Sequence, residues 1–367
     1  MPHPRPRPGI LEIEPYVGGK SHAKSEKPVA KLSSNENALG PSPKAIEAFQ
    51  AESLNLHRYP DGNCTALRAA IARRHNLDPE TIVCGAGSDE LIALIVRAFA
   101  GPGDEVLYSA HGFLMYKLAA LGAGAHPVVA PEKDARADVD ALLKAVTSRT
   151  KLVFIANPNN PTGSYLTGPE LQRLREGLPH DVVLVVDAAY AEFVTAADYS
   201  SGLELATSLP NTIMTRTFSK LYGLASLRIG WMVSSPHIVD IVNRVRGPFN
   251  VSQPAQAAAL AALEDLEHQE LSRRHNEEWL AWLAREIGAA GFHVYPSVGN
   301  FLLVRFPSTP GRTAEDAAHF LENEGILPRM MHAYGLPDCL RLSIGLETDN
   351  RRMVEALKAF AKGAKAA

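Results

Sequence analysis

Residues 151–190 read KLVFIANPNNPTGSYLTGPELQRLREGLPHDVVLVVDAAY. Two short apolar runs, 151–156 and 182–186, enclose a segment from 168 to 178 whose apolar residues recur at helical spacing. A buried strand, an amphipathic helix and a second buried strand are typical of a β–α–β unit, in which the two strands run parallel. This stretch therefore predicts a parallel sheet that is covered by helices on both faces.

The same alternation extends through most of the chain. Further apolar runs predict strands at 81–87, 105–110, 212–217 and 227–234, and helical periodicity appears at 64–76, 88–100, 138–146 and 235–245. A long helical stretch then covers 252–291, and a strand, a helix, a strand and a helix follow at 300–306, 313–325, 339–345 and 350–363. We expect the α/β class, with a mostly parallel central sheet in a large domain and a smaller α+β domain beside it.

The N-terminus differs from the rest, because residues 1–10 read MPHPRPRPGI. Prolines at alternate positions exclude a helix and favour an extended arm on the surface. We expect residues 1–42 to form this arm and part of the small domain, residues 43–265 the large domain, and residues 266–367 the small C-terminal domain.

The composition excludes several classes of protein but does not identify a function. The chain has 367 residues, 46% hydrophobic residues and a formal net charge of −3 at pH 7. This balance argues against a nucleic-acid binder, and no apolar run approaches the roughly 20 residues that span a bilayer. The three cysteines form no Cys-x-x-Cys pair, which argues against a zinc or disulfide scaffold and fits the reducing cytoplasm. We expect no metal ion.

The strongest local signal surrounds Lys220, in 215-TRTFSKLYGLASLRIGW-231. The lysine follows an apolar strand and stands in a turn rich in hydroxyl groups, with Arg228 nearby in sequence. A lysine that attacks a carbonyl needs a lowered pKa, which burial or a neighbouring cation provides. For this segment alone, a hydrolase-like Ser–Lys pair or an ordinary turn remains an alternative.

Two motifs rich in glycine and proline follow other predicted strands. In 85-GAGSDE, the glycines let backbone N–H groups approach an anion, and Ser88 or Asp89 is expected to cap the following helix. A dinucleotide-binding motif would need a third glycine where Glu90 stands. In 157-NPNNPTG, the prolines and Gly163 make a rigid turn that can hold an asparagine side chain in place. Each motif alone fits a plain turn equally well.

Asp187 ends a strand that is otherwise apolar, and Tyr190 follows it. Ligands of doubly wound sheets bind at the carboxyl ends of the strands. A buried carboxylate there needs a positive partner, for which a protonated ring nitrogen or an arginine would serve. Together the four segments supply a reactive amine, an anion cradle, a buried carboxylate and hydrogen-bonding Asn and Tyr side chains. A pyridoxal 5′-phosphate (PLP) enzyme requires this set.

On these residues the chain resembles fold-type I PLP-dependent aminotransferases, and within that group the histidinol-phosphate aminotransferases. The matching segments are 14-EPYVGGK, 33-SSNENALGPSP, 59-YPDGN, 85-GAGSDE, 113-FLMY, 157-NPNNPTG, 187-DAAY, 217-TFSKLYGLASLRIG, 247-GPFNV and 334-YGLPDCLR. The lysine segment, NPTG and the Asp–Tyr pair indicate the superfamily, whereas PYVGGK, NEN, YPDG and YGLPDCLR indicate the substrate.

The resemblance implies catalytic roles for Lys220, Asp187 and Tyr190. Lys220 would bind the aldehyde of PLP covalently and then move a proton between the substrate α-carbon and C4′ of the cofactor. Asp187 would keep the pyridine nitrogen protonated, while Asn160 and Tyr190 would hydrogen-bond the phenolic oxygen. The other residues implied to contact the cofactor are Ala86, Gly87, Ser88, Phe113, Thr217, Ser219, Arg228 and, from a second subunit, Tyr59.

The resemblance also implies the substrates and the assembly. Arg341 would bind the α-carboxylate of glutamate or 2-oxoglutarate through both arms of its guanidinium, and would meet the phosphate of histidinol phosphate in the other half-reaction. The residues implied at the far end of the substrate are Tyr16, Asn35 and Arg329. The implied partners are small molecules and a second copy of the chain, in a homodimer whose subunits share each active site.

Three alternatives remain open at this point. The first is an aminotransferase for aromatic or a broad range of amino acids on the same scaffold. The second is a PLP-dependent decarboxylase of a phosphorylated amino acid such as threonine phosphate. The third is a non-catalytic binding or regulatory module with the PLP-enzyme fold. The first differs from the leading hypothesis in its substrate, the second in the reaction, and the third in lacking turnover.

Overall fold

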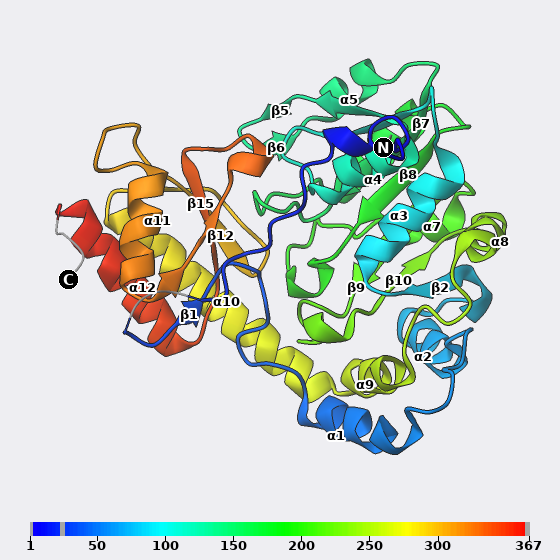
Figure 1. Ribbon diagram of the computed structural model, residues 1–367, viewed down its shortest axis with the longest axis horizontal. Helices are drawn as coiled ribbons and strands as arrows, with labels where there is room; N and C mark the ends of the chain where they lie inside the picture. The colour runs from blue at the N-terminus through cyan, green and yellow to red at the C-terminus, as the bar shows by residue number, and fades with distance from the viewer. Residues whose placement is uncertain (1–2, 23–25, 364–367) are drawn as a thin grey trace.

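The computed structural model describes residues 3–22 and 26–363, and its centre is a seven-stranded sheet in the order β2-β10-β9-β8-β7-β3-β4 (Figure 1). These strands are β2 (Ile82–Gly85), β3 (Glu105–Ser109), β4 (His126–Ala130), β7 (Thr150–Ala156), β8 (Val183–Asp187), β9 (Thr212–Thr217) and β10 (Gly230–Val233). Only β10 of this sheet runs antiparallel to its neighbours, β2 and β9. The predicted α/β class with a mostly parallel sheet is confirmed.

Side chains that alternate along the strands bury both faces of this sheet. Leu152 and Phe154 of β7 pack on one face, whereas Val153 and Ile155 pack on the other. The helices of the large sheet are α2 (Thr65–His75), α3 (Ser88–Phe99), α4 (Met115–Ala123), α5 (Val139–Ala145), α6 (Gly168–Gly177), α7 (Leu203–Ser208), α8 (Pro236–Val245) and α9 (Gln253–Glu264). Helices α3, α4 and α8 cover the first face, and α5 and α6 cover the second. A strand buried on both faces explains the continuous apolar runs of the sequence.

Two elements differ from the expectations. The edge strand β4 was not predicted because Pro127 lies within it, and proline is tolerated in a sheet mainly on an edge strand. The helix expected over 252–291 is two helices, since α9 ends at Glu264 and α10 (Leu266–Ala289) begins after Asp265. The Asp265 carboxylate accepts hydrogen bonds from Ser42 Oγ and Lys44 Nζ, which anchors the break to the start of α1 (Pro43–Ala51).

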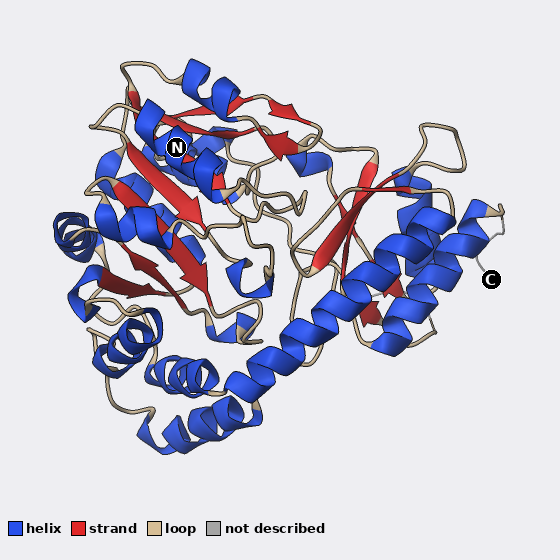
Figure 2. Cartoon of the chain, turned by 180° about the vertical axis from the view of Figure 1, so that it is seen from behind, coloured by secondary structure: helices blue, strands red, loops and turns tan. Residues whose placement is uncertain are grey.

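A second sheet follows α10 in the chain, and Figure 2 shows α10 as a long helix running away from α9. Its order is β11-β12-β15-β14, and all its pairs are antiparallel. The elements here are β11 (His293–Val294), β12 (Phe301–Arg305), α11 (Ala314–Asn323), β13 (Ile326–Leu327), β14 (Arg329–Met330), β15 (Cys339–Ser343) and α12 (Glu347–Ala361). The short β5 (Glu132–Lys133) and β6 (Arg136–Ala137) form a separate hairpin beside the large sheet.

The N-terminal segment contacts elements of both parts of the molecule. Strand β1 (Ala30–Lys31) pairs in parallel with β13 in a two-stranded sheet of their own, and the turn at Ile10–Glu12 packs near α4 (Figure 1). Residues 3–8 are exposed and form no helix, as the prolines predict, and one 3-10 turn follows at Ile10–Glu12. Arg7 Nη2 donates to the carbonyl of Gly122 at 2.6 Å. Met1 and Pro2 of the predicted arm lie outside the described residues. In the part of the chain that the structure describes, no helix is long and apolar enough to cross a membrane.

Candidate active site

A cavity of about 200 Å³ opens where three neighbouring strands end. Ala156, Asp187 and Thr217, the last residues of β7, β8 and β9, all line it. The predicted site residues that the structure brings together in this cavity are Tyr16, Asn35, Ser88, Phe113, Asn160, Asp187, Tyr190, Thr217, Ser219, Lys220, Arg228, Arg329 and Arg341. Parallel strands place their carboxyl ends at one edge of the sheet, which is why segments far apart in sequence meet here.

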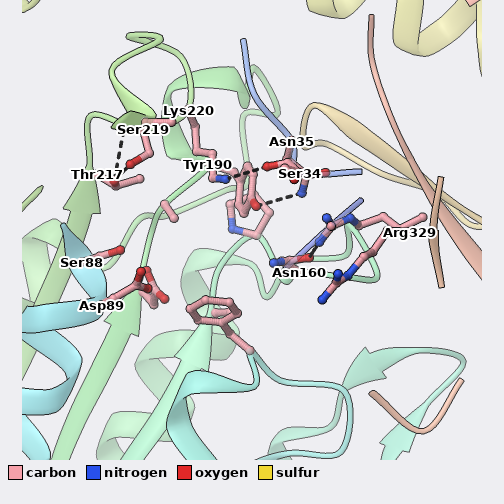
Figure 3. Close-up of a pocket in the computed structure, with 18 of the residues that line it drawn as sticks. Ser34, Asn35, Ser88, Asp89, Asn160, Tyr190, Thr217, Ser219, Lys220 and Arg329 are labelled. Carbon is pink, nitrogen blue, oxygen red and sulfur yellow. Dashed lines mark hydrogen bonds between the residues drawn. The ribbon is translucent and has the colours of Figure 1, made fainter. Parts of the chain in front are cut away.

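Lys220 lies near the middle of the cavity, with Ser219 and Thr217 on one side of it and Arg329 on the other (Figure 3). Its Nζ donates to the carbonyl oxygen of Ser34 at 3.3 Å and stands 5.5 Å from the centre of the Tyr190 ring. Burial, together with the positive charge of Arg341, lowers the pKa of Lys220 to about 8. A lysine in this state carries a nucleophilic amine near neutral pH.

The Ser–Lys alternative does not fit the hydrogen bonds. Ser219 Oγ accepts from Thr217 Oγ1 at 3.0 Å and from Arg228 Nη1 at 3.3 Å. Lys220 points elsewhere, toward Ser34. The serine hydroxyl is thus directed to the Arg228 side of the cavity, and the amine is directed to its centre.

Asp187 is 4% exposed and has hydroxyl partners instead of an arginine. Tyr116 Oη donates to its Oδ2 at 2.9 Å, and Thr215 Oγ1 donates to its Oδ1 at 3.1 Å. Burial raises the pKa of Asp187 to about 6, against the lowering effect of these two donors. The arginine alternative is therefore wrong, since the partners of this buried carboxylate are hydroxyl groups, and its contact with a cationic ligand stays a prediction.

Tyr190 and Asn160 are held by residues of the small sheet and of the N-terminal segment. Asn35 Nδ2 donates to Tyr190 Oη at 3.0 Å, which leaves the tyrosine proton available for another acceptor (Figure 3). Burial raises the pKa of Tyr190. Asn160 Oδ1 accepts from Arg341 Nη1 at 2.5 Å, so its amide N–H groups stay available for another acceptor.

Arg341 is 6% exposed and has an unsatisfied donor. Its Nη1 is bonded to Asn160 and its Nη2 to the carbonyl of Ser33 at 2.7 Å, while its buried Nε has no partner among the described residues. An unpaired buried donor on a cation costs free energy unless a ligand satisfies it. An anionic ligand group such as a carboxylate would do so.

The anion cradle forms where α3 begins. Gly87, with a positive φ of 83°, is the residue before the helix, and no side chain caps it. The expectation that Ser88 or Asp89 caps this helix is therefore wrong, and the first N–H groups stay free for a ligand. A Cβ atom on Gly87 would lie 2.5 Å from Arg228 Nη2, so a side chain here would displace the end of this arginine from its present position. Arg228 also meets Asp89 Oδ2 at 2.9 Å.

Of the remaining predicted residues, some line the cavity and others lie outside it. Tyr16 is exposed, and the Arg329 guanidinium lies 5.7 Å from its ring centre while Nη2 donates to the carbonyl of Val17 at 2.6 Å. Phe113 reaches the cavity from the loop before α4. Ala86 precedes the cradle without lining the cavity, and Tyr59 lies outside it, 83% exposed, with its ring stacked at 4.7 Å on Phe249.

Sequence reasoning assigned no role to several residues that the structure places in or beside the cavity. They are Ser33, Ser34, Tyr116, Thr215 and Tyr334. Tyr116 and Tyr334 stand inside the matching segments 113-FLMY and 334-YGLPDCLR, so the segments carried a signal. Their partners lie too far along the chain for spacing to reveal them.

Comparisons with known proteins agree with this geometry. The sequence pattern of the family aminotransferase class I and II matches residues 27–357. A histidinol-phosphate aminotransferase of Paramagnetospirillum magneticum is 55% identical over 98% of this chain and 99% of its own length. Another, of Rhodospirillum centenum, is 54% identical over 99% of this chain and 100% of its own length.

Solved structures show the same likeness. The crystal structure of histidinol-phosphate aminotransferase from Sinorhizobium meliloti in complex with pyridoxal-5'-phosphate has a TM-score of 0.86 at 30% identity, and the match covers 92% of each chain. An aspartate aminotransferase of Thermus thermophilus, at 22% identity and a TM-score of 0.80, shares the fold. The chain belongs to the aminotransferase class I and II family, among the histidinol-phosphate aminotransferases.

Proposed function

We propose that the protein is a PLP-dependent aminotransferase that moves an amino group from histidinol phosphate to 2-oxoglutarate, giving imidazole acetol phosphate and glutamate, in histidine biosynthesis. The observation that carries the reaction is that the Lys220 amine, the uncapped N-terminus of α3 and the buried Asp187 share one cavity. The substrate follows from the relatives, which share more than half of their residues with this chain over nearly its whole length.

The cavity fits PLP at three points. The free N–H groups at the start of α3, with Ser88, Ser219 and Arg228, suit a phosphate dianion. Asp187 suits a protonated pyridine nitrogen, because its remaining lone pairs face a cavity with no other cation bonded to it in the described residues. Phe113 lines the same cavity and would pack on the face of the ring.

When bound, PLP supplies an electron sink that stabilises negative charge at the substrate α-carbon. Lys220 would hold the cofactor through its amine, and as a free amine it would hold and return the proton that moves between the substrate α-carbon and C4′. Its pKa of about 8 leaves about a tenth of the amine neutral at pH 7, so it can accept the proton and return it.

The residues around the ring would set its charge. Asp187 would hold the proton on the pyridine nitrogen, which keeps the ring electron-withdrawing. The Tyr190 hydroxyl and the Asn160 amide would donate to the phenolic oxygen, because Asn35 and Arg341 already occupy their acceptor atoms. Ala86, Gly87 and Thr217 would complete the cradle, together with the residues named above.

Arg341 would hold the amino acid substrate through its α-carboxylate. Its unpaired Nε and its buried position favour a bidentate contact that excludes water. Histidinol phosphate lacks the carboxylate, so in that half-reaction Arg341 would be free to meet the phosphate. Arg329 and Tyr16, at the open end of the cavity, would contact the far end of either substrate, with Asn35 nearby.

We further propose a homodimer in the cytoplasm, with the domains divided at 42/43 and 265/266. Tyr59 and Phe249 form an exposed aromatic pair, and Leu54 and Leu56 are also exposed nearby in sequence, as an interface with a second copy requires. From such an interface Tyr59 would reach the cradle of the other subunit. Sedimentation of the wild type and of a Tyr59→Ala, Phe249→Ala variant tests this, with a monomer expected only for the variant.

A panel of amino donors assayed with 2-oxoglutarate tests the reaction and the substrate. The purified enzyme loaded with PLP should have its largest kcat/KM with histidinol phosphate and should form glutamate. A larger kcat/KM with phenylalanine would indicate the aromatic aminotransferase. Release of carbon dioxide without a keto acid would indicate the decarboxylase, and no turnover with any donor would indicate a binding module. Lys220→Ala should abolish both turnover and the visible absorbance of the bound cofactor.

A further inference from the structure

Two buried hydroxyl groups hold the carboxylate of Asp187 from opposite sides. Tyr116 on α4 bonds Oδ2 at 2.9 Å, and Thr215 on β9 bonds Oδ1 at 3.1 Å. Both residues are 0% exposed, so water cannot replace either donor. Each carboxylate oxygen therefore has a fixed neutral hydroxyl donor.

The tyrosine is itself fixed in place. Its ring stacks on Phe154 at 4.6 Å with an interplanar angle of 19°, and it meets Phe113 edge-to-face at 5.9 Å. Phe154 belongs to β7, the strand next to β8, so the sheet sets where the Tyr116 hydroxyl lies. The donor thus reaches Asp187 without the loss of side-chain entropy that a mobile group would suffer.

The groups around Asp187 act on its protonation in opposite directions. Burial favours the neutral acid, and the negative charge of Asp89 on α3 adds to this effect. The hydroxyls of Tyr116 and Thr215 and the backbone N–H of Ala189 favour the carboxylate. A neutral Asp187 would present one O–H donor and could not balance the charge of a protonated ring nitrogen.

We propose that Tyr116 and Thr215 are positioning residues that keep Asp187 ionised and turned toward the pyridine nitrogen of PLP. This inference rests on the role proposed above for Asp187. Neither residue lines the cavity, so each acts through Asp187 and without contact with the substrate. Loss of either donor leaves a buried oxygen unsatisfied and shifts Asp187 toward the neutral acid.

The test measures PLP binding to the apoprotein over a range of pH, by the absorbance of the bound cofactor and the quenching of tryptophan fluorescence. In the wild type, binding should weaken as the pH falls through about 6, where Asp187 takes up a proton. Tyr116→Phe keeps the ring and removes only the hydroxyl. It should weaken binding at neutral pH by about tenfold to a hundredfold and move this midpoint to higher pH.

Tyr108→Phe is the matched control. Tyr108 is also buried, at 5% exposed, and its ring meets that of Tyr116 edge-to-face at 6.2 Å. Within the described residues its hydroxyl makes no hydrogen bond to Asp187. This variant should bind PLP as the wild type does, with the same midpoint.

Two variants of Thr215 test the positioning role independently, and they remain informative if Tyr116→Phe does not fold. Thr215→Val should weaken binding in the same direction, and Thr215→Ser should restore it because the hydroxyl returns. Suppose that Tyr116→Phe and Thr215→Val both bind PLP with the affinity and pH midpoint of the wild type, while Asp187→Asn binds it poorly. This result would overturn the role of the two donors but not that of Asp187. Wild-type binding by Asp187→Asn would instead overturn the role of Asp187 itself.

Discussion

Replacing Arg341 with lysine separates the two half-reactions. The guanidinium bonds Asn160 Oδ1 at 2.5 Å and the Ser33 carbonyl at 2.7 Å, and its Nε remains for the substrate. A lysine ammonium is a point charge without a planar fork, so it cannot keep these protein contacts and bind a carboxylate bidentately as well. We expect the glutamate half-reaction to lose one charge-assisted hydrogen bond.

Such a bond contributes about 1.5–3 kcal/mol. Because 1.36 kcal/mol corresponds to a factor of ten in rate, kcat/KM with glutamate should fall by about tenfold to a hundredfold. Histidinol phosphate has no carboxylate, and lysine binds a phosphate well as a point charge. The histidinol phosphate half-reaction should therefore fall by less.

Single-turnover kinetics measure each half-reaction separately, through the absorbance of the bound cofactor. Arg305→Lys is the control, because Arg305 is an exposed arginine of the same sheet, paired with Asp338 at 2.6 Å. It should leave both rates unchanged. An equal fall in both half-reactions of Arg341→Lys, or no fall with glutamate, would refute the bidentate contact.

Three further predictions concern cofactor binding and stability. Folding raises the pKa of Asp187 from 3.8 to about 6. The protonated side chain therefore stabilises the folded state fully below pH 3.8, and this contribution of about 3 kcal/mol to the unfolding free energy is lost as the pH rises through 6. Urea unfolding of the apoprotein should show this loss in the wild type relative to Asp187→Asn, and parallel pH profiles would contradict it. Gly87→Ala should weaken PLP binding, because its Cβ displaces Arg228, whereas Gly103→Ala, at a similar positive φ in open space, should not; fluorescence titration compares them. Trp231→Ala should lower the unfolding free energy by about 3–5 kcal/mol, since this side chain is 2% exposed in the core, and a denaturant midpoint close to that of the wild type would argue against this packing.

Much of the large sheet was predictable because burial on both faces leaves a continuous apolar run, and β7, β8 and β9 all carry one. The edge strand β4 escaped prediction, since four of its five residues are half-buried or exposed and one of these is proline. The interruption of the long helix at Asp265 could not be predicted from the sequence either. Its cause is a contact with Ser42 and Lys44, more than two hundred residues earlier in the chain.

The candidate site was likewise predictable only in part. Lys220, Asp187, Asn160 and Arg228 were accessible from the sequence because each belongs to a short motif at the end of a strand. Asn35 was named with them, but as a residue at the far end of the substrate. In the structure its side chain bonds Tyr190, which lies 155 residues away. Its place beside Tyr190 follows from the N-terminal segment lying against β15, where its backbone N–H bonds Ser343.

The sequence by itself determined the α/β class, the motifs at the strand ends and the chemical groups available to a cofactor, because each depends on residues close together along the chain. Only the tertiary structure decided which groups meet. Tyr116 reaches Asp187 across 71 residues, and Arg341 reaches Asn160 across 181. Periodicity records which side of an element is buried, but the order of the strands and the packing of helices on them decide its neighbours. The tertiary structure therefore decides that Tyr116 and Thr215 donate to Asp187 and that the charge of Arg341 acts on Lys220.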